Sequence, residues 1–264
     1  MSEKPPPDVA RQLAQHLESL RNAGVEFVPG ATPVEPKPAP PRRLSAPTAL
    51  PTVTPARTVP MLQVEALPQD EAQQRIQQLA DLAKQVARCV RCPHLASTRT
   101  QTVFGVGPLD PDLCFVGEAP GADEDRVGEP FVGAAGQLLT RIMIASGLSR
   151  EEVFICNILR CRPPGNRTPT PEEADHCKEW LEKTIALVRP RFLVAWGGTA
   201  AKHLLDTTLG ITLLRGKFYD YRGIPVLCTF HPSALFHAPE KKKDVWEDMK
   251  TLMARLGRPI PGKG

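Results

Sequence analysis

The stretch "CFVGEAPGADEDRVGEPFVGAAGQLL", residues 114–139, decides the fold class of this chain. It passes from an apolar strand, through a loop rich in glycine and carboxylates, into a helix with an apolar face. Open α/β sheets form their ligand sites at the carboxyl ends of buried strands, which is where such a loop lies. The stretch therefore predicts an α/β fold with a binding site in this loop.

The alternation of strands and helices continues along the chain. Apolar strands are predicted at 112–117, 151–161 and 191–198, each followed by an amphipathic helix. The segment 217–235 predicts a hairpin with a last core strand, and 243–257 predicts the closing helix. An earlier helix at 68–89 has a predicted apolar face of Ile76, Leu79, Ala80, Ala83 and Val86. This pattern predicts a three-layer α/β/α sandwich around a central, mainly parallel sheet.

The first part of the chain has a different composition. Thirteen of the 29 prolines precede residue 61, and residues 1–88 contain no Trp, Tyr or Cys. Such a segment buries too little apolar surface to fold alone, so 1–67 is predicted to be a largely disordered extension. It contains a possible short helix, with apolar residues from Val9 to Leu20, that could serve an unknown protein partner. The folded domain is expected at 68–258, with a tail at 259–264.

The charge and hydropathy of the chain limit its function classes. A net charge of +4 is compatible with nucleic-acid binding without requiring it. No apolar run approaches the roughly 18 residues of a membrane span, and no signal-peptide core is present. We expect a soluble, cytoplasmic monomer that does not bind membranes. The seven cysteines, an odd count, favour a metal centre or free thiols over a disulfide framework.

Four of the cysteines have the spacing of a metal centre. Cys89 and Cys92 form a C-x2-C pair, and Cys161 and Cys177 flank a loop rich in proline. Four thiolates suit zinc or a four-iron cluster, and the long second spacing favours iron–sulfur over zinc. The alternative is a set of scattered buried thiols. The other three lie in apolar strands and are interpreted as small core residues: Cys114, Cys156 and Cys228.

Three further motifs follow one another in the chain: "GEAPGADEDRVGEPFVGAAGQLL" (117–139), "NILRCRPPGNRTPTPEE" (157–173) and "HPSAL" (231–235). With the four cysteines, they closely resemble the family 4 uracil-DNA glycosylases, the iron–sulfur branch of that superfamily, over about residues 75–256. The resemblance implies a monofunctional enzyme that hydrolyses the N-glycosidic bond of uracil in single- or double-stranded DNA. It leaves an abasic site and initiates base excision repair. It also implies a 4Fe-4S cluster on Cys89, Cys92, Cys161 and Cys177.

The resemblance assigns roles to three residues of these motifs. Phe131 matches the residue that stacks on the flipped uracil, and Asn157 matches the residue that reads its edge. An amide accepts from uracil N3–H and donates to O4, and it mismatches cytosine. His231 matches the catalytic histidine, which would stabilise charge on O2 of the departing base.

Five more positions are expected to complete the site. Glu118 is grouped with the catalytic residues, in a positional role, and Ser233 belongs to the substrate-binding "HPS" motif. Gly121 and Glu124 are expected to close the pocket against the methyl group of thymine, and Asn166 to place water or a phosphate. The nearby carboxylates Asp123 and Asp125 are interpreted as solvated or as helix caps.

Basic residues around the motifs are the predicted contacts to the DNA backbone. They are Arg160, Arg162, Arg167 and Lys241 to Lys243. After "HPS" the family usually has an apolar residue and Arg, whereas this chain has Leu235, Phe236 and His237. Leu235 and Phe236 are expected to wedge into the duplex, and the change puts duplex affinity in question.

Three alternative functions stand beside this interpretation. One is a catalytically weak or non-turnover uracil-DNA-binding protein, whose related branch carries an extra basic loop with a His that this chain lacks. Another is a four-cysteine module that binds nucleic acid without regard to uracil. A nucleotide-binding α/β enzyme is disfavoured, because neither G-x-x-x-x-G-K-[ST] nor G-x-G-x-x-G follows any strand.

Overall fold

The structure is a computed structural model that describes residues 69–261, so the predicted extension at 1–67 lies outside the described residues. Five strands form one sheet in the order β2-β1-β3-β5-β4. Only β4 is antiparallel to its neighbour. The mainly parallel sheet that the sequence predicts is therefore confirmed. The strands are β1 (Leu113–Gly117), β2 (Val153–Asn157), β3 (Phe192–Trp196), β4 (Phe218–Tyr221) and β5 (Ile224–Thr229).

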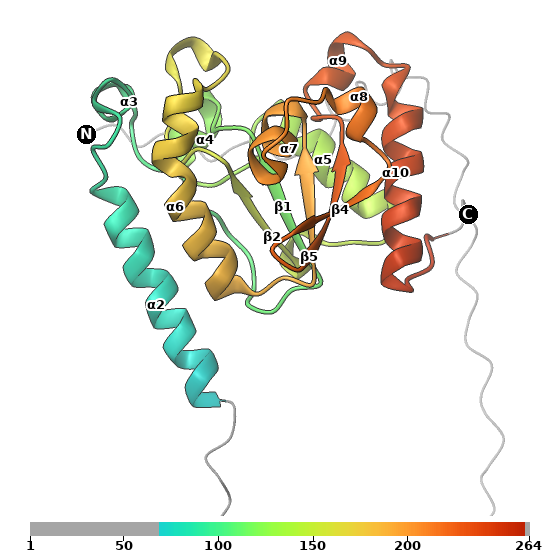
Figure 1. Cartoon of the computed structure of the whole chain (residues 1–264), viewed down its shortest axis with the longest axis horizontal. Coiled ribbons are helices and arrows are strands. Elements are labelled where there is room, and N and C mark those ends of the chain that lie inside the picture. Colours follow the sequence, from blue (N-terminus) through green and yellow to red (C-terminus); the bar gives the residue numbers. More distant parts are fainter. Residues whose placement is uncertain (1–68, 262–264) are drawn as a thin grey trace, which may run out of the picture. The chain divides into compact units, whose positions relative to one another are not determined.

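Helices cover both faces of this sheet, as Figure 1 shows. One face packs against α2, α6 and α7, and the other against α5 and α10. The three layers make up the predicted α/β/α sandwich. The α-helices are α2 (Gln69–Ala87), α3 (Pro93–Thr98), α4 (Ala122–Val127), α5 (Ala134–Ala145), α6 (Pro171–Val188), α7 (Gly198–Leu205), α8 (Ile211–Leu214), α9 (Ala234–His237) and α10 (Lys241–Leu256), with short 3-10 turns at Arg150–Glu152 and Pro164–Asn166.

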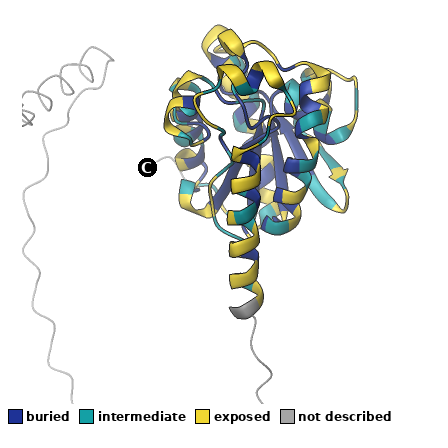
Figure 2. Ribbon diagram, turned by 90° about the vertical axis from the view of Figure 1, so that its left-hand side faces the viewer, coloured by how far each residue is buried: buried dark blue, intermediate teal, exposed yellow. Residues whose placement is uncertain are grey.

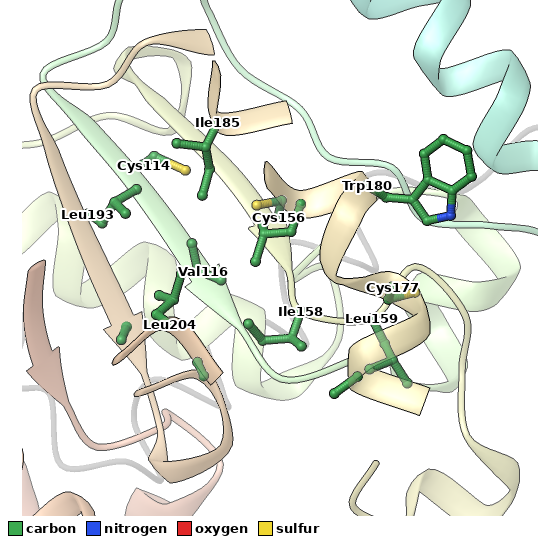
Figure 3. Packing of buried hydrophobic residues seen from close by; sticks show 14 of the residues in the cluster. Cys114, Val116, Cys156, Ile158, Leu159, Cys177, Trp180, Ile185, Leu193 and Leu204 are labelled. Atoms are coloured by element: carbon green, nitrogen blue, oxygen red, sulfur yellow. The ribbon is translucent and has the colours of Figure 1, made fainter. Parts of the chain in front are cut away.

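Strands β1, β2 and β3 are buried along their whole length, which explains why they are apolar up to their carboxyl ends. In β1, Cys114 and Val116 face one core, and Leu113 and Phe115 face the other. Figure 2 shows these buried strands inside a shell of exposed helix surface. Figure 3 shows Cys114 and Val116 in the first core with α6 residue Ile185. Cys114, Cys156 and Cys228 are fully buried, as their place in apolar strands predicts.

Helix α2 is rotated from its predicted orientation. Ile76 is 50% exposed, so its predicted place on the buried face was wrong. Val86 is buried as predicted, but Arg75 and Leu82, which were not assigned to that face, are buried with it. The Arg75 guanidinium forms an ion pair with Asp110 and donates to the carbonyl of Leu187, which turns this side of the helix inward. No helix within residues 69–261 is long and apolar enough to cross a membrane.

Candidate active site

A cavity of about 350 Å³ lies at the carboxyl edge of the sheet. Its walls come from the segments that follow β1, β2, β3 and β5, and from the loop before α5. Helices α4 and α9 lie at this end of the sheet in Figure 1. All eight of the pocket residues expected from the sequence line this one cavity: Glu118, Gly121, Glu124, Phe131, Asn157, Asn166, His231 and Ser233.

Phe131 has an unusual backbone conformation for an aromatic residue. Its φ is +55°, in the left-handed region that disfavours residues with a Cβ. The Arg150 guanidinium holds this turn by donating to the carbonyls of Phe131 (3.1 Å) and Pro130 (2.9 Å). Gly136 is required behind it, because a Cβ there would lie 1.9 Å from the Phe131 oxygen. The ring is thereby directed to the cavity, 5.6 Å from the His231 ring.

Glu124 organises the loop that holds Phe131. One carboxylate oxygen accepts the N–H groups of Val132 and Gly133, both at 2.9 Å, and the other accepts the N–H of Gly121 at 3.1 Å. The carboxylate thus links the two ends of the loop and lines the cavity at the same time. The helix α4 between them was not predicted, because six residues within a loop give no clear periodicity.

The neighbouring carboxylates differ in their surroundings. Asp123 is exposed and forms an ion pair with Arg126, as expected of a solvated residue. Asp125 is only 3% exposed and accepts the backbone N–H of Thr100 on both oxygens, at 3.0 Å each. Asp125 is therefore neither solvated nor the cap of the next helix, so its interpretation was wrong. Its carboxylate connects α4 to the segment after α3.

Asn157 ends β2 directly beside Gly117, the last residue of β1. Its side chain is buried, and Gly117 leaves the space that it needs. A Cβ on Gly117 would lie 2.4 Å from Asn157 Oδ1 and 2.5 Å from Phe131 Cζ. The amide and the aromatic ring therefore meet over a glycine, and this arrangement suits a flat ring with a polar edge.

His231 follows β5 and has a fixed tautomer. The backbone N–H of Ser233 donates to His231 Nδ1 at 3.2 Å, and Ser233 Oγ lies 2.7 Å from the same nitrogen. Because an N–H only donates, Nδ1 is the acceptor, and the neutral ring carries its proton on Nε2. Burial lowers the pKa of His231 to about 4. The ring is therefore an uncharged hydrogen-bond donor at neutral pH.

Glu118 has a partner that the sequence analysis did not find. Thr199, at the start of α7, donates its hydroxyl to Glu118 Oε2 at 2.5 Å. Gly197 and Gly198 line the cavity beside it. Gly197 has a φ of +98°, and a Cβ at this position would lie 2.9 Å from His231 Cβ. The only available signal was the "GGTA" stretch after a buried strand, which is a typical position for a ligand site.

The predicted DNA-contacting arginines do not form one group. Arg160 is 1% exposed and lies in the core, so its prediction as a backbone contact was wrong. Arg162 donates to Asn166 Oδ1 at 2.7 Å. Arg167 lines the cavity and binds both oxygens of Glu173, at 2.6 and 2.9 Å. Periodicity misses the burial of Arg160 because it follows the end of a strand.

The two apolar residues after "HPS" also differ in burial. Leu235 is 1% exposed and packs in the second core, so the prediction that it wedges into a duplex was wrong. Phe236 is 48% exposed on the short helix α9 and stays available to a partner. A one-turn helix turns these adjacent side chains in different directions, which the sequence alone did not reveal.

The four cysteines of the predicted metal centre come together from distant segments. Burial raises the pKa of Cys92 to about 11, and the nearby thiols of Cys177, Cys161 and Cys89 add to that rise. Cys89 also acts on Cys161 and Cys177, and Cys161 acts on Cys177, so the four thiols lie in one region of the fold. Arg99 donates to Cys161 Sγ at 3.0 Å and to the carbonyl of Cys89 at 2.8 Å.

The number and spacing of these donors bear on the metal that they could hold. Among the described side chains, no three Cys, His, Asp or Glu residues are grouped closely enough to hold a metal ion. A cluster of four irons is larger than one ion and takes one thiolate at each corner, so its ligands stand further apart. The four thiols match the number and type of ligands that such a cluster takes. Arg99, which is not a ligand, donates a hydrogen bond to one of them.

Fold and cavity together define a class of protein. It is an α/β enzyme whose pocket, at the carboxyl edge of a parallel sheet, presents an aromatic face, an amide and a neutral imidazole to a planar polar ring. The family model of the uracil DNA glycosylase superfamily matches residues 104–250. The chain belongs to this superfamily, and its relatives are named type-4 uracil-DNA glycosylases.

Two of these relatives show the extent of the similarity. The type-4 uracil-DNA glycosylase of Archaeoglobus fulgidus is 38% identical over 196 residues, which are 70% of this chain and 97% of the relative. The enzyme of the same name from Thermotoga maritima is 44% identical over 173 residues, 64% of this chain and 90% of the relative. A type-5 uracil-DNA glycosylase of Pyrobaculum aerophilum is less similar, at 31% identity.

Proposed function

We infer that the protein is a monofunctional uracil-DNA glycosylase that hydrolyses the N-glycosidic bond of uracil and leaves an abasic site for base excision repair. The observation that carries this inference is the single cavity lined by Phe131, Asn157 and neutral His231. The names of the relatives agree with it. A base inside a duplex cannot reach such a pocket, so the enzyme must take uracil out of the stack at a cost of a few kcal/mol.

Recognition of uracil is proposed to use two side chains. Phe131 stacks on the ring, and such stacking contributes about 1–3 kcal/mol per base. The Asn157 amide accepts from N3–H and donates to O4, whereas cytosine presents the reverse pattern. The loop fixed by Glu124, with Gly121 at its start, closes the side where thymine carries its methyl group.

Cleavage is proposed to depend on charge stabilisation. The bond breaks with an oxocarbenium-like sugar on one side and a uracil anion on the other. His231 Nε2–H donates to O2 as its negative charge develops, and a preorganised neutral donor of this kind needs no reorganisation during the reaction. The phosphates of the DNA itself stabilise the sugar cation.

Glu118 is proposed to position the attacking water. Thr199 occupies its Oε2 and fixes the carboxylate at the cavity wall, which leaves Oε1 to accept from a water molecule. Water added to the sugar carbon then yields the abasic site, and the second proton of the water goes to solvent or to the carboxylate. Among residues 69–261 no lysine lines this cavity, so the proposal includes no Schiff base and no strand cleavage.

We also propose that Cys89, Cys92, Cys161 and Cys177 hold a 4Fe-4S cluster. When bound, it would supply a covalent cross-link between the chain before α3, the loop after β2 and helix α6. Arg99 supports this arrangement because it donates to Cys161 Sγ in the loop after β2 and to the carbonyl of Cys89 before α3. Asn166, at the edge of the cavity, is carried by the same loop, and Arg162 fixes its side chain.

Contacts to the DNA backbone are assigned to basic groups that are at least partly exposed. Arg162, Arg167 and Lys241 to Lys243 are the proposed phosphate ligands, and Phe236 is the proposed apolar contact. The bidentate pair with Glu173 offsets part of the Arg167 charge, so we expect the other cations to contribute more to affinity.

The test is excision from labelled oligonucleotides that carry one uracil, one thymine or one cytosine at the same position. We expect strand breaks only with uracil and only after alkaline treatment. Breaks before alkali would contradict a monofunctional enzyme. Tight, uracil-dependent binding without product would favour the non-turnover alternative.

A further inference from the structure

Arg160 is a charged side chain placed in the core of the protein. It follows β2 and is 1% exposed. Its guanidinium donates to the carbonyl of Asn157 and to Thr184 Oγ1 on α6, both at 3.1 Å, and lies 5.4 Å from the Phe104 ring. Its Nε is buried without a hydrogen-bond partner. The side chain therefore connects the residue proposed to read uracil with the second layer of the fold.

The described residues provide no carboxylate for this cation. None of the ion pairs between residues 71 and 261 includes Arg160, although Arg215 and Arg75, which are also largely shielded, each pair with an aspartate. A buried charge without a countercharge destabilises a fold by several kcal/mol. A buried arginine at this position therefore calls for an anionic group other than a carboxylate.

The segments that Arg160 joins carry two of the proposed ligands. Thr184, which accepts from the guanidinium, lies on α6, and the same helix carries Cys177. The residue after Arg160 in the chain is Cys161, a second proposed ligand. Four thiolates carry more negative charge than the iron–sulfur core can neutralise, so the loaded centre is an anion. Figure 3 shows Cys177 on α6 near Ile158 and Leu159, the residues that lead to Arg160.

We propose that Arg160 is the buried countercharge of the iron–sulfur centre and the link through which that centre positions Asn157. The inference rests on the proposed cluster and on the proposed role of Asn157. One end of the guanidinium fixes the Asn157 backbone, and the residue itself lies between Asn157 and the ligand Cys161. An intact centre keeps Arg160 in place, and Arg160 keeps the uracil-reading amide in register with Phe131.

Cys156 is the competing source of negative charge. A hydrogen bond from Cys114 is the main reason that the pKa of Cys156 falls to about 7, and the Arg160 charge adds to that lowering. If this thiolate were the countercharge, removing it would change the protein as much as removing Arg160 does. The two possibilities therefore predict different results for Cys156→Ala.

The experiment uses full-length protein purified without oxygen. Iron per chain, visible absorption, the rate of iron loss to a chelator and the midpoint potential are measured beside the kcat and KM of uracil excision. The variants are Arg160→Met, Arg160→Lys and Cys156→Ala. Lys178→Met is the matched control, because Lys178 is adjacent to Cys177 in sequence but exposed.

Arg160→Met is expected to lose iron about tenfold faster than wild type and to have a more negative midpoint potential. Arg160→Lys is expected to keep the iron and the potential, because the charge remains, but to raise KM, because one ammonium cannot hold both Asn157 and Thr184. Cys156→Ala and Lys178→Met should match wild type in iron retention.

Two results would overturn the inference. One is an Arg160→Met protein that keeps iron and potential unchanged, and the other is a Cys156→Ala protein that loses iron as fast as Arg160→Met. If Arg160→Met does not fold, the iron content of Arg160→Lys tests the inference. Loss of iron from Arg160→Lys would show that the shape of the side chain, and not its charge, retains the cluster, and would contradict the inference. A wild-type protein without iron would instead contradict the proposed cluster, so the two failures are distinguishable.

Discussion

The backbone N–H of Ser233 donates to Nδ1 of His231 over 3.2 Å, and this bond determines which ring nitrogen carries the proton. The Ser233 hydroxyl lies 2.7 Å from the same nitrogen. Both contacts come from the turn that begins α9, so the "HPS" motif is a device for orienting an imidazole. The proton is left on Nε2, where it can be donated to an anion.

We therefore expect His231 to stay neutral, with its proton on Nε2, between about pH 5 and pH 8. Burial is the cause, since it lowers the pKa of this ring to about 4. Nitrogen chemical shifts of histidine-labelled protein measure both the charge and the tautomer. A ring that titrates near its ordinary value, or one with its proton on Nδ1, would contradict this assignment.

The same buried ring should make stability depend on pH. As pH falls from about 6.5 to about 4, the unfolded chain binds a proton at His231 and the folded chain does not. The free energy of unfolding should therefore decrease through this range. His231→Gln should remove part of that decrease, as seen by denaturant titration at several pH values. An identical pH profile in variant and wild type would be evidence against a buried, neutral ring.

Gly117→Ala should abolish excision while the protein still folds. A Cβ at this position would meet both Asn157 Oδ1 and the Phe131 ring at about 2.5 Å or less, so neither side chain could keep its place. We expect at least a 100-fold loss in kcat/KM, of the size seen when a site loses a key electrostatic contact. Gly210→Ala is the control, because its Cβ would meet nothing within 4 Å and should leave activity unchanged.

Arg150 is expected to act on catalysis only through Phe131. Arg150→Met removes the donors that hold the two carbonyls of the turn, so the ring should be less well directed to the cavity. We expect each of Arg150→Met and Phe131→Ala to lower kcat/KM about tenfold or more. In the double variant the two losses should not add. Full additivity in this double-mutant cycle would show that Arg150 acts by another route.

Thr199 is expected to position Glu118. Thr199→Val keeps the shape of the side chain but cannot donate to Oε2, so kcat should fall while KM changes little. Thr199→Ser keeps the hydroxyl and should restore most of the rate. Steady-state kinetics of the two variants measure the difference, and equal rates would rule out the hydrogen bond as the reason for this residue.

The sequence predicted the layers of the fold and the residues of the cavity for a physical reason. Parallel strands must be apolar on both faces, and their carboxyl ends meet at one edge, so the motifs that follow them converge. This is why Phe131, Asn157 and His231, from three separate motifs, line one cavity. The cysteines could be grouped by spacing, but spacing alone does not identify a metal.

The features that the sequence did not predict depend on tertiary contacts of individual side chains. Arg160 and Leu235 follow strand or motif ends, where periodicity does not indicate depth, and both are buried. Arg150 and Thr199 contact the site from elements that carry no motif of their own. Ile76 was assigned to the wrong face of α2 because the buried stripe of that helix includes a charged residue, Arg75.

The most direct test of the account is the single-turnover rate of uracil release from an oligonucleotide, measured for wild type, His231→Ala and Asn157→Ala. We predict rapid release by wild type and a release rate that is about 100-fold or more lower in each variant. The circular dichroism spectra of the variants should match that of wild type, which would show that they are folded. Release at the wild-type rate by either variant would contradict the assigned role of that residue. No release by the iron-loaded wild type would contradict the glycosylase function itself.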